Sequence, residues 1–364
     1  MDRSPDTALN RICPYFTMFP LRFPYRLLRQ HASQGDFVLD PFCGRGTTNY
    51  AARLLGLDSA GIDSSPVAAA IGAAKTVSVT PEAVLATHDR LLARSAEETV
   101  PTGDFWDRCF HPEVLDRICR LRGALLQACS QPEEVALRAI ILGALHGPRS
   151  KGAPSHLSNQ APRTYAPKPR YAVKYWTERD LRPPKVDVRS VIHVRAERYY
   201  QRECTPARGR VLLADSRTLS ARHVHRPADW VITSPPYYGL RTYLPDQWLR
   251  LWFLGGPPQP DYTSANHLNH GSPERFANEL RKVWQATAEV SSGNARLCVR
   301  FGGINDRSAS PRAIIDHSIC DSGWKVQTVK SAANATAGKR QADHFLASRQ
   351  RPVAEFDLWA VRGE

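Results

Sequence analysis

The feature that most constrains the fold is an apolar run followed by a glycine turn and then by a helical pattern. Residues 37–39 are apolar and predict a buried strand, while Gly44 and Gly46 permit a tight turn with close ligand approach. Thr48 to Leu55 carries Ala and Leu residues as a helix does. This order of strand, turn and helix predicts a nucleotide-binding unit in an α/β sheet. The chain lacks Gly-x-Gly-x-x-Gly spacing and a Gly-Lys-Ser/Thr sequence there, which disfavours dinucleotide and triphosphate sites.

An acidic side chain follows the glycine turn at the end of the next apolar segment. Asp63 closes this segment, where a carboxylate can bind both ribose hydroxyls of a nucleotide. Residues 64–66 then start an Ala-rich helix that we expect to run from Val67 to Ala74. Asp63 is therefore also placed to cap that helix, and both roles fit the same position.

A stiff loop follows a second apolar run much later in the chain. Trp230 to Ile232 predicts a buried parallel strand, and Ser234-Pro235-Pro236-Tyr237 cannot continue it because two prolines remove two backbone donors. Open α/β sheets place their chemistry at this end of a strand. The alternative is a proline-rich turn without chemistry.

The groups in this loop suit a planar substrate that carries an exocyclic amino group. The Ser234 hydroxyl and a proline carbonyl can accept hydrogen bonds from the amino group, while the Tyr237 ring can stack on the base. An aromatic amine is a poor nucleophile because its lone pair is delocalised into the ring. Acceptors that hold both hydrogens out of the ring plane would localise that lone pair, ready for a positioned electrophile.

Taken together, two motifs resemble those of a known family. Asp40-Pro41-Phe42-Cys43-Gly44-Arg45-Gly46-Thr47 and Ser234-Pro235-Pro236-Tyr237 are similar to the cofactor and catalytic motifs of the amino-group DNA methyltransferases, which use S-adenosylmethionine. The Ser form of the catalytic motif resembles the N4-cytosine branch, and the cofactor motif precedes it as in the α-type order. The resemblance covers residues 15–75 and 209–301 well, and the tail loosely.

The resemblance implies an α/β fold with a Rossmann-like seven-stranded methyltransferase sheet and a large helical and basic insertion. It also implies roles for individual residues. The catalytic residues would be Ser234, Pro235, Pro236 and Tyr237. The cofactor would be bound by Thr17, Phe19, Asp40, Pro41, Phe42, Gly44, Gly46, Thr47, Asp63, Ser64, Asp215 and Ser216. Of these, Thr17 and Phe19 belong to a Phe-Pro-rich segment that would pack on the methionine end, although a hydrophobic cap on the core is the alternative. Asp215, after the third strand, would lie near the adenine amino group.

The positive net charge of the chain favours a polyanionic partner. The 364 residues carry a net charge of +14 and the pI is about 9.6, which is typical of nucleic-acid-binding proteins, although a generically basic protein is the alternative. Most of the excess lies in residues 149–210, where 15 basic residues face 5 acidic ones among interleaved Pro, Tyr and Trp. We expect this stretch to face DNA, although it could instead be a solvated linker.

The residues expected to contact DNA come from this stretch and from the loop after the catalytic motif. They are Arg163, Lys168, Arg170, Lys174, Tyr238, Arg241 and Tyr243. We expect residues 1–75 and 209–364 to form the catalytic domain, with 76–208 inserted as a target-recognition region. The insertion would precede the third strand, whereas the recognition region of the α-type order follows it.

Cysteine usage and hydropathy point to a reducing compartment and no membrane. Eight cysteines include no Cys-x-x-Cys pair and no accompanying His cluster at zinc spacing, so we expect reduced thiols, no metal site and a cytoplasmic protein. No run of 18 apolar residues exists, and residues 1–10 lack a signal-peptide core.

The remaining chain predicts further helices and strands. Residues 81–145 predict three or four helices, and His88, His111 and His146 within them are expected to be structural. Further helices are expected at 244–254, 272–289 and 311–320, the second capped by Ser272. Late strands are expected at 295–301, 324–329 and 356–361, and residues 340–351 as an exposed loop.

The resemblance implies a site-specific methyltransferase that acts on cytosine N4 in duplex DNA by base flipping, without a metal or a covalent intermediate. Methylation of adenine N6, or of RNA, is the first alternative, and a catalytically silent nucleic-acid-binding protein is the second. Ser234 and the charge disfavour a protein-glutamine methyltransferase, whose motif begins with Asn. No nuclease motif is present in the sequence, so a restriction-modification role would need a separate cognate endonuclease.

Overall fold

The computed structural model describes most of the chain. The described residues are 8–15, 20–95, 98–147, 155–161, 168–201, 207–239, 247–261, 268–304, 309–332 and 352–363. Statements about structure below concern these ranges.

A seven-stranded sheet forms the centre of the molecule, in the order β3-β2-β1-β4-β5-β7-β6. The strands are β1 (Phe37–Asp40), β2 (Asp58–Asp63), β3 (Gly209–Leu213), β4 (Ala228–Thr233), β5 (Ser291–Ile304), β6 (Trp324–Ser331) and β7 (Pro352–Arg362). The first five in this spatial order run parallel, and β7 runs antiparallel to both β5 and β6. This confirms the predicted α/β, Rossmann-like seven-stranded fold.

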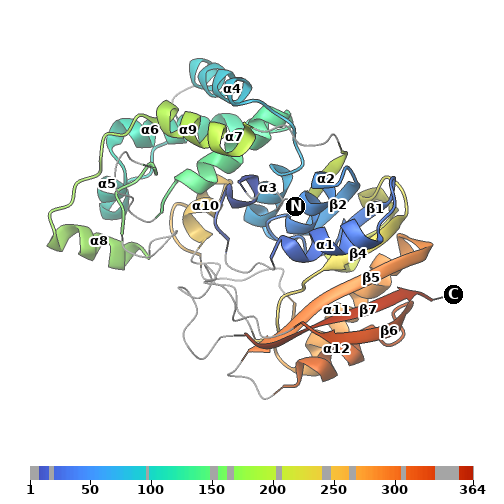
Figure 1. The fold of residues 1–364 in the computed structure, drawn as a ribbon. Helices are drawn as coiled ribbons and strands as arrows, with labels where there is room; N and C mark the ends of the chain where they lie inside the picture. Colours follow the sequence, from blue (N-terminus) through green and yellow to red (C-terminus); the bar gives the residue numbers. More distant parts are fainter. Residues whose placement is uncertain are drawn as a thin grey trace.

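Alternation along β1 separates two hydrophobic cores, because successive strand residues face opposite sides of the sheet. Val38 packs with helices α1 (Arg22–His31), α2 (Thr47–Leu54) and α3 (Pro66–Ala73) on one face. Phe37 and Leu39 pack on the other face, which α11 (Pro273–Glu289) and α12 (Pro311–Ile319) cover. The helices α11 and α12 lie together against the sheet in Figure 1.

Between β2 and β3, the part of the chain that the structure describes forms α3 and then six further helices. These are α4 (Pro81–Arg94), α5 (Asp104–Cys109), α6 (Pro112–Gln127), α7 (Pro132–Ala144), α8 (Pro169–Glu178) and α9 (Val188–Tyr200). They gather on one side of the molecule, away from β5, β6 and β7 (Figure 1). Their buried side chains belong to the same continuous core as α1, α2 and α3. They are therefore packed onto one face of the sheet and are not separated from it by solvent.

Four of these helices, α4 to α7, confirm the prediction for residues 81–145. Helices α8 and α9 were not predicted, because the proline-rich, basic composition of residues 149–210 masked two short amphipathic segments. Pro169 occupies the first turn of α8, and Asp187 caps α9 by accepting hydrogen bonds from the Arg189 and Ser190 amides. The linker alternative for that stretch is wrong for these two segments.

Later elements follow the predictions with shifted ends. Ser272 caps α11 as expected, with its hydroxyl accepting from the Arg275 amide at 3.2 Å. Strands β5 and β7 extend beyond the predicted ranges. Helix α10 (Trp248–Phe253) lies within the predicted 244–254, of which residues 244–246 are outside the described ranges. Residues 340–351 lie outside the described ranges.

The described residues include most of the cysteines and two of the histidines considered above. Seven described cysteines are free, and six of these are buried or half-buried. Within the described ranges no group of His, Cys, Asp or Glu side chains could hold a metal ion, and no helix is long and apolar enough to cross a membrane. His88 and His146 are buried, and burial lowers the pKa of both imidazoles, as expected of structural histidines.

Candidate active site

Four strand ends meet at one edge of the sheet. Because β3, β2, β1 and β4 are neighbours and parallel, the loops that follow them come together at their carboxyl ends. These loops contain the residues predicted to bind a cofactor and to act on a base.

The glycine turn after β1 is held against the end of β2 by a carboxylate. Asp63 accepts a hydrogen bond from the Gly44 amide at 2.8 Å and another from the Ser65 amide at 2.8 Å. Burial raises the pKa of Asp63 to about 6, although both amides oppose this. Each carboxylate oxygen keeps a second lone pair, so Asp63 can accept further hydrogen bonds from a ligand. The neighbouring Ser64 is exposed.

Two glycines shape this turn for different reasons. Gly44 has a φ of +50°, and a Cβ added there would meet no atom within 4 Å, so open space adjoins the backbone. Gly46 has a φ of +73°, and a Cβ added there would lie 2.8 Å from the Gly72 Cα of α3. The second glycine therefore serves close packing, while the first faces space that a ligand can fill.

A buried carboxylate joins the glycine turn after β1 to the Ser234 to Tyr237 loop after β4. Asp40 ends β1 and is fully buried, and it accepts a hydrogen bond from the Thr233 hydroxyl at 2.6 Å and from the Phe42 amide at 3.1 Å. Burial raises its pKa to about 6, against the opposing effect of Thr233 and Thr48. Thr48 of α2 also donates to the Ile232 carbonyl at 3.3 Å. The end of β4, one residue before Ser234, is thereby fixed to the β1 loop.

The end of β3 contacts the same loop. The buried Ser216 hydroxyl donates to the Pro41 carbonyl. Asp215 lies beside it and is half-exposed, and its carboxylate pairs with Arg217 at 2.6 Å. The Arg217 hydrogen bonds lower the pKa of Asp215, although partial burial opposes this. Asp215 therefore stays ionised near neutral pH, with one side open to solvent.

Other predicted cofactor residues pack around this turn. Pro41 is buried, and Phe42 is half-buried with its ring edge-on to Trp284 at 6.2 Å between centroids. Thr47 is buried at the start of α2. Thr17 and Phe19 lie outside the described residues.

The Ser234 to Tyr237 loop is anchored from the opposite side by β5 and β7. The Tyr237 hydroxyl donates to the Glu355 carboxylate at 2.7 Å, and both side chains are buried. The Tyr237 ring also meets Phe301 edge-on, with 5.5 Å between centroids. Ser234 is half-exposed and Pro235 is buried. The tyrosine ring is thus fixed in orientation from two strands.

The residues after this loop are held by a histidine. The Gly239 amide donates to Nδ1 of His270 at 3.0 Å, and the His270 ring stacks on Tyr238 with 6.1 Å between centroids. Gly239 has a φ of +79°, a backbone conformation that favours glycine. Arg241 and Tyr243 lie outside the described residues.

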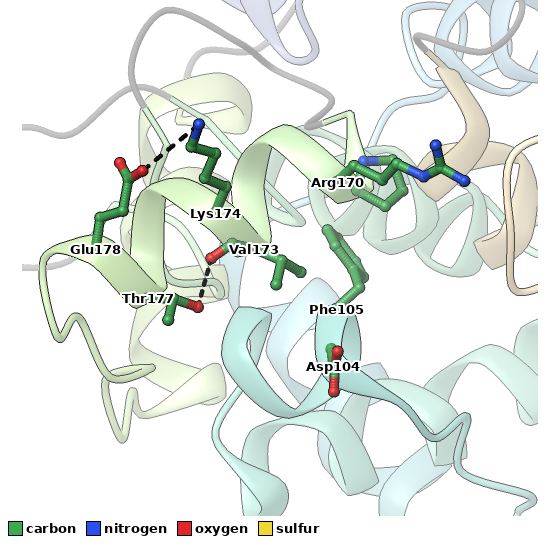
Figure 2. A pocket seen from close by; sticks show the side chains of 8 residues that line it. Asp104, Phe105, Arg170, Val173, Lys174, Thr177 and Glu178 are labelled. Atoms are coloured by element: carbon green, nitrogen blue, oxygen red, sulfur yellow. Dashed lines mark hydrogen bonds and ion pairs between the residues drawn. The ribbon is translucent and has the colours of Figure 1, made fainter.

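The described basic residues among those predicted to contact DNA do not join this cluster. Lys168, Arg170 and Lys174 lie at or within α8, which packs on α5. Arg163 lies outside the described residues. A cavity of about 520 Å³ is lined by residues of α5 and α8 and is open to solvent (Figure 2). It lies among the helices between β2 and β3, apart from the four strand ends.

Sequence reasoning missed three residues that position these loops, namely Thr233, His270 and Glu355. Thr233 adjoins the catalytic motif, so a polar residue at the end of an apolar strand was the available signal. For Glu355 the signal was an acid within the alternating run of residues 352–362, but the expected strand began only at Phe356. Nothing in the sequence around His270 pointed to its role.

The two glycine environments predict unequal costs of substitution. Gly46→Ala should lower the free energy of unfolding by about 2–5 kcal/mol, because a left-handed backbone and a clash with Gly72 combine. Gly35→Ala is the matched control, since Gly35 has a φ of +88° but nothing within 4 Å of an added Cβ. It should cost only about 1–2 kcal/mol. Urea unfolding of both variants measures the difference, and equal losses would contradict close packing at Gly46.

Sequence comparisons relate the first part of the chain to known proteins. Residues 3–74 match the model of a family described as DNA methylase, N6_N4_Mtase. The chain is 54% identical over 35 residues to the Type II methyltransferase M.BsoBI of Geobacillus stearothermophilus, a match to 10% of this chain and 7% of that protein. It is 44% identical over 45 residues to the Type II methyltransferase M.MthZI of Methanothermobacter thermautotrophicus, a match to 12% of this chain and 13% of that protein. Each match therefore spans only a small part of the relative.

Structural comparison finds distant matches over nearly the whole chain. TrmN from Thermus thermophilus aligns with 98% of this chain and 52% of its own, at 10% identity and a TM-score of 0.38. A SAM-dependent methyltransferase from Methanosarcina mazei aligns with 95% of this chain and 98% of its own, at 8% identity and a TM-score of 0.36. The match to the DNA methylase model, over residues 3–74, includes the glycine turn and Asp63.

Proposed function

We propose that this protein is a site-specific DNA methyltransferase that uses S-adenosylmethionine to methylate the exocyclic N4 amino group of cytosine in duplex DNA. The DNA methylase match over residues 3–74 and the basic charge support the substrate class. The observation that carries the proposal is the 2.6 Å hydrogen bond from Thr233 to Asp40. It joins the glycine turn to the Ser234 to Tyr237 loop at one edge of the sheet.

The glycine turn fits the proposed cofactor. Open space beside Gly44 and the spare lone pairs of Asp63 suit a ribose and its neighbouring groups. Asp63 would accept hydrogen bonds from the ribose hydroxyls, and the half-exposed Asp215 would accept from the adenine amino group. Asp40 is fully buried, so we assign it to holding the loops together. When bound, S-adenosylmethionine supplies an electrophilic methyl group on its sulfonium sulfur.

The catalytic loop would act on the target amino group. Ser234 and the Pro235 carbonyl accept hydrogen bonds from its two hydrogens, which localises the nitrogen lone pair toward the electrophile. After the methyl group is transferred, the nitrogen carries a positive charge and loses one proton. The base must leave the helix to reach this loop, and Tyr237 gives its ring a flat surface.

Glu355 would keep Tyr237 in its working orientation. A buried carboxylate that accepts the tyrosine hydroxyl fixes the rotation of the ring, while Phe301 supports its edge. Glu355 is thus a positioning residue that acts through Tyr237.

Ser at position 234 favours cytosine N4 over adenine N6, because the Ser-Pro-Pro-Tyr motif resembles the N4-cytosine branch. We assign residues 1–75 and 209–364 to the catalytic domain and 76–208 to DNA recognition. The Type II methyltransferase relatives suggest a restriction-modification system with a separate endonuclease.

Nucleoside mass spectrometry of plasmid DNA from cells that express the protein tests the reaction. We expect N4-methylcytosine with the wild type and none with Ser234→Ala or Tyr237→Ala, with circular dichroism showing that both variants fold. N6-methyladenine would contradict the assignment to cytosine. Unmodified plasmid DNA, from cells that contain soluble wild-type protein, would contradict the proposed function.

Cofactor affinity should depend on pH through Asp63. The ribose hydroxyls donate to the ionised carboxylate, and the pKa of Asp63 is about 6, so affinity should rise from pH 5 to pH 7 and then level off. The titratable groups nearby are Tyr15, Cys43 and Asp40. Burial and the Asp63 charge raise the pKa values of Tyr15 and Cys43, so both stay protonated over this range.

Calorimetric titration with S-adenosylhomocysteine measures this dependence. Asp63→Asn should bind at least about tenfold more weakly at pH 7.5, a loss of about 1.4 kcal/mol. The variant should also lose most of the pH dependence, with any remainder arising from Asp40, whose pKa is also about 6. A wild-type affinity that is constant from pH 5 to pH 8 would argue against ribose binding by Asp63.

The Tyr237–Glu355 hydrogen bond should be visible as a coupling in steady-state kinetics. Glu355→Ala should lower kcat about tenfold with little change in the KM for cofactor, which corresponds to about 1.4 kcal/mol. Glu355→Gln keeps an acceptor and should recover most of that loss. The double variant Glu355→Ala with Tyr237→Phe should have a kcat no lower than that of the more severe single variant. Additive losses would show that Glu355 acts independently of the tyrosine hydroxyl.

A further inference from the structure

Helix α8 presents an ordered aromatic and cationic face to solvent. Tyr171 and Tyr175 stack with 6.4 Å between ring centroids and an interplanar angle of 23°, and Tyr171 is 51% exposed. The Arg179 guanidinium lies over the Tyr175 ring, 4.2 Å from its centroid. These three side chains form a row at i, i+4 and i+8 on the helix. The opposite side of α8 is buried through Ala172 and Trp176.

Positive charge is in surplus on α8 and in the residues that flank it. Residues 168–182 contain five cations and two acids. Among the neighbouring helices, Lys185 pairs with Glu113 at 2.6 Å and Arg189 pairs with Asp89 at 3.0 Å. In each of those pairs one acid neutralises one cation.

On α8 itself the acids are too few to balance the cations. The single carboxylate of Glu178 is shared by Lys174 at 3.7 Å and Arg179 at 3.4 Å. Arg170 makes no ion pair with any described residue. The Lys174 side chain is 74% exposed, so its ammonium is available to a partner.

The groove beneath α8 is mixed in charge. Phe105, Val173 and Pro169 give it an apolar lining, Asp104 and Glu178 add carboxylates, and Arg170 and Lys174 line it as well. Figure 2 shows Arg170 and Lys174 extending from α8 away from Asp104. An anionic partner inside the groove would approach the two acids, so it would meet these two cations more favourably from outside the groove.

We propose that the outer face of α8 binds the sugar–phosphate backbone of duplex DNA. This inference rests on the proposed function and adds to it the element that holds the substrate. Arg170, Lys174 and Arg179 would neutralise phosphates, while Tyr171 and Tyr175 would pack on sugars and donate hydroxyls to phosphate oxygens. Such contacts position the duplex without reading its sequence. The preformed Tyr171–Tyr175–Arg179 row reduces the ordering needed on binding.

Fluorescence anisotropy with a labelled 30-base-pair duplex of mixed sequence tests this at 50 to 200 mM salt. Arg170→Ala combined with Lys174→Ala in the full chain should weaken binding about tenfold, and should reduce the slope of log affinity against log salt by about 2. Lys325→Ala combined with Lys330→Ala removes the same charge from exposed positions of β6 and should leave the slope unchanged. Tyr171→Ala should weaken binding without changing the slope.

The outcomes separate this inference from the proposed reaction. Binding that depends on α8, in a protein that does not methylate DNA, would support the inference and contradict the proposed function. Equal slopes for the α8 variant and the wild type would overturn the inference even if methylation occurs. If the β6 control lost as much DNA affinity and slope as the α8 variant, binding would respond only to net charge, which would overturn the inference. Tighter α8-dependent binding of duplex RNA than of DNA would overturn the choice of DNA.

Discussion

The hydrogen bond between Thr233 and Asp40 is the contact on which the site depends. It lies at the end of two adjacent parallel strands and joins the glycine turn after β1 to the Ser234 to Tyr237 loop after β4. Burying a carboxylate is unfavourable, and the raised pKa of Asp40 reflects that cost. Hydrogen bonds from the Thr233 hydroxyl and the Phe42 amide offset part of this desolvation cost. The buried carboxylate of Asp40 can therefore stay between the two loops.

The surrounding structure maintains this spacing from several directions. Asp63 holds the glycine turn to β2, and Glu355 holds Tyr237 to β7. The helices between β2 and β3 share a core with one face of the sheet, so they cannot move as an independent unit without exposing apolar surface. Arg250 of α10 adds a polar link, since it is fully buried and donates to the Leu142 carbonyl of α7 at 3.2 Å and the Pro14 carbonyl at 2.7 Å.

Sequence patterns predicted the sheet and the edge where its loops meet, because alternation, glycine turns and proline-terminated strands are local features. They could not predict which distant side chains fix those loops, since the Tyr237–Glu355 contact joins residues 118 positions apart and depends on β7 lying beside β5. Helix α8 was missed for a different reason. Its fully buried residues are only Ala172 and Trp176, within a basic, proline-rich stretch, so composition outweighed periodicity.

A crystal structure of the protein with S-adenosylhomocysteine tests the central claim most directly. The account predicts that the ribose hydroxyls lie within hydrogen-bonding distance of the Asp63 carboxylate and the adenine lies beside Asp215 and Ser216. It also predicts that the Thr233 hydroxyl still donates to Asp40 and that Ser234 faces the sulfur of the ligand. A ligand bound away from the four strand ends, or a Ser234 side chain turned away from the sulfur, would contradict the account.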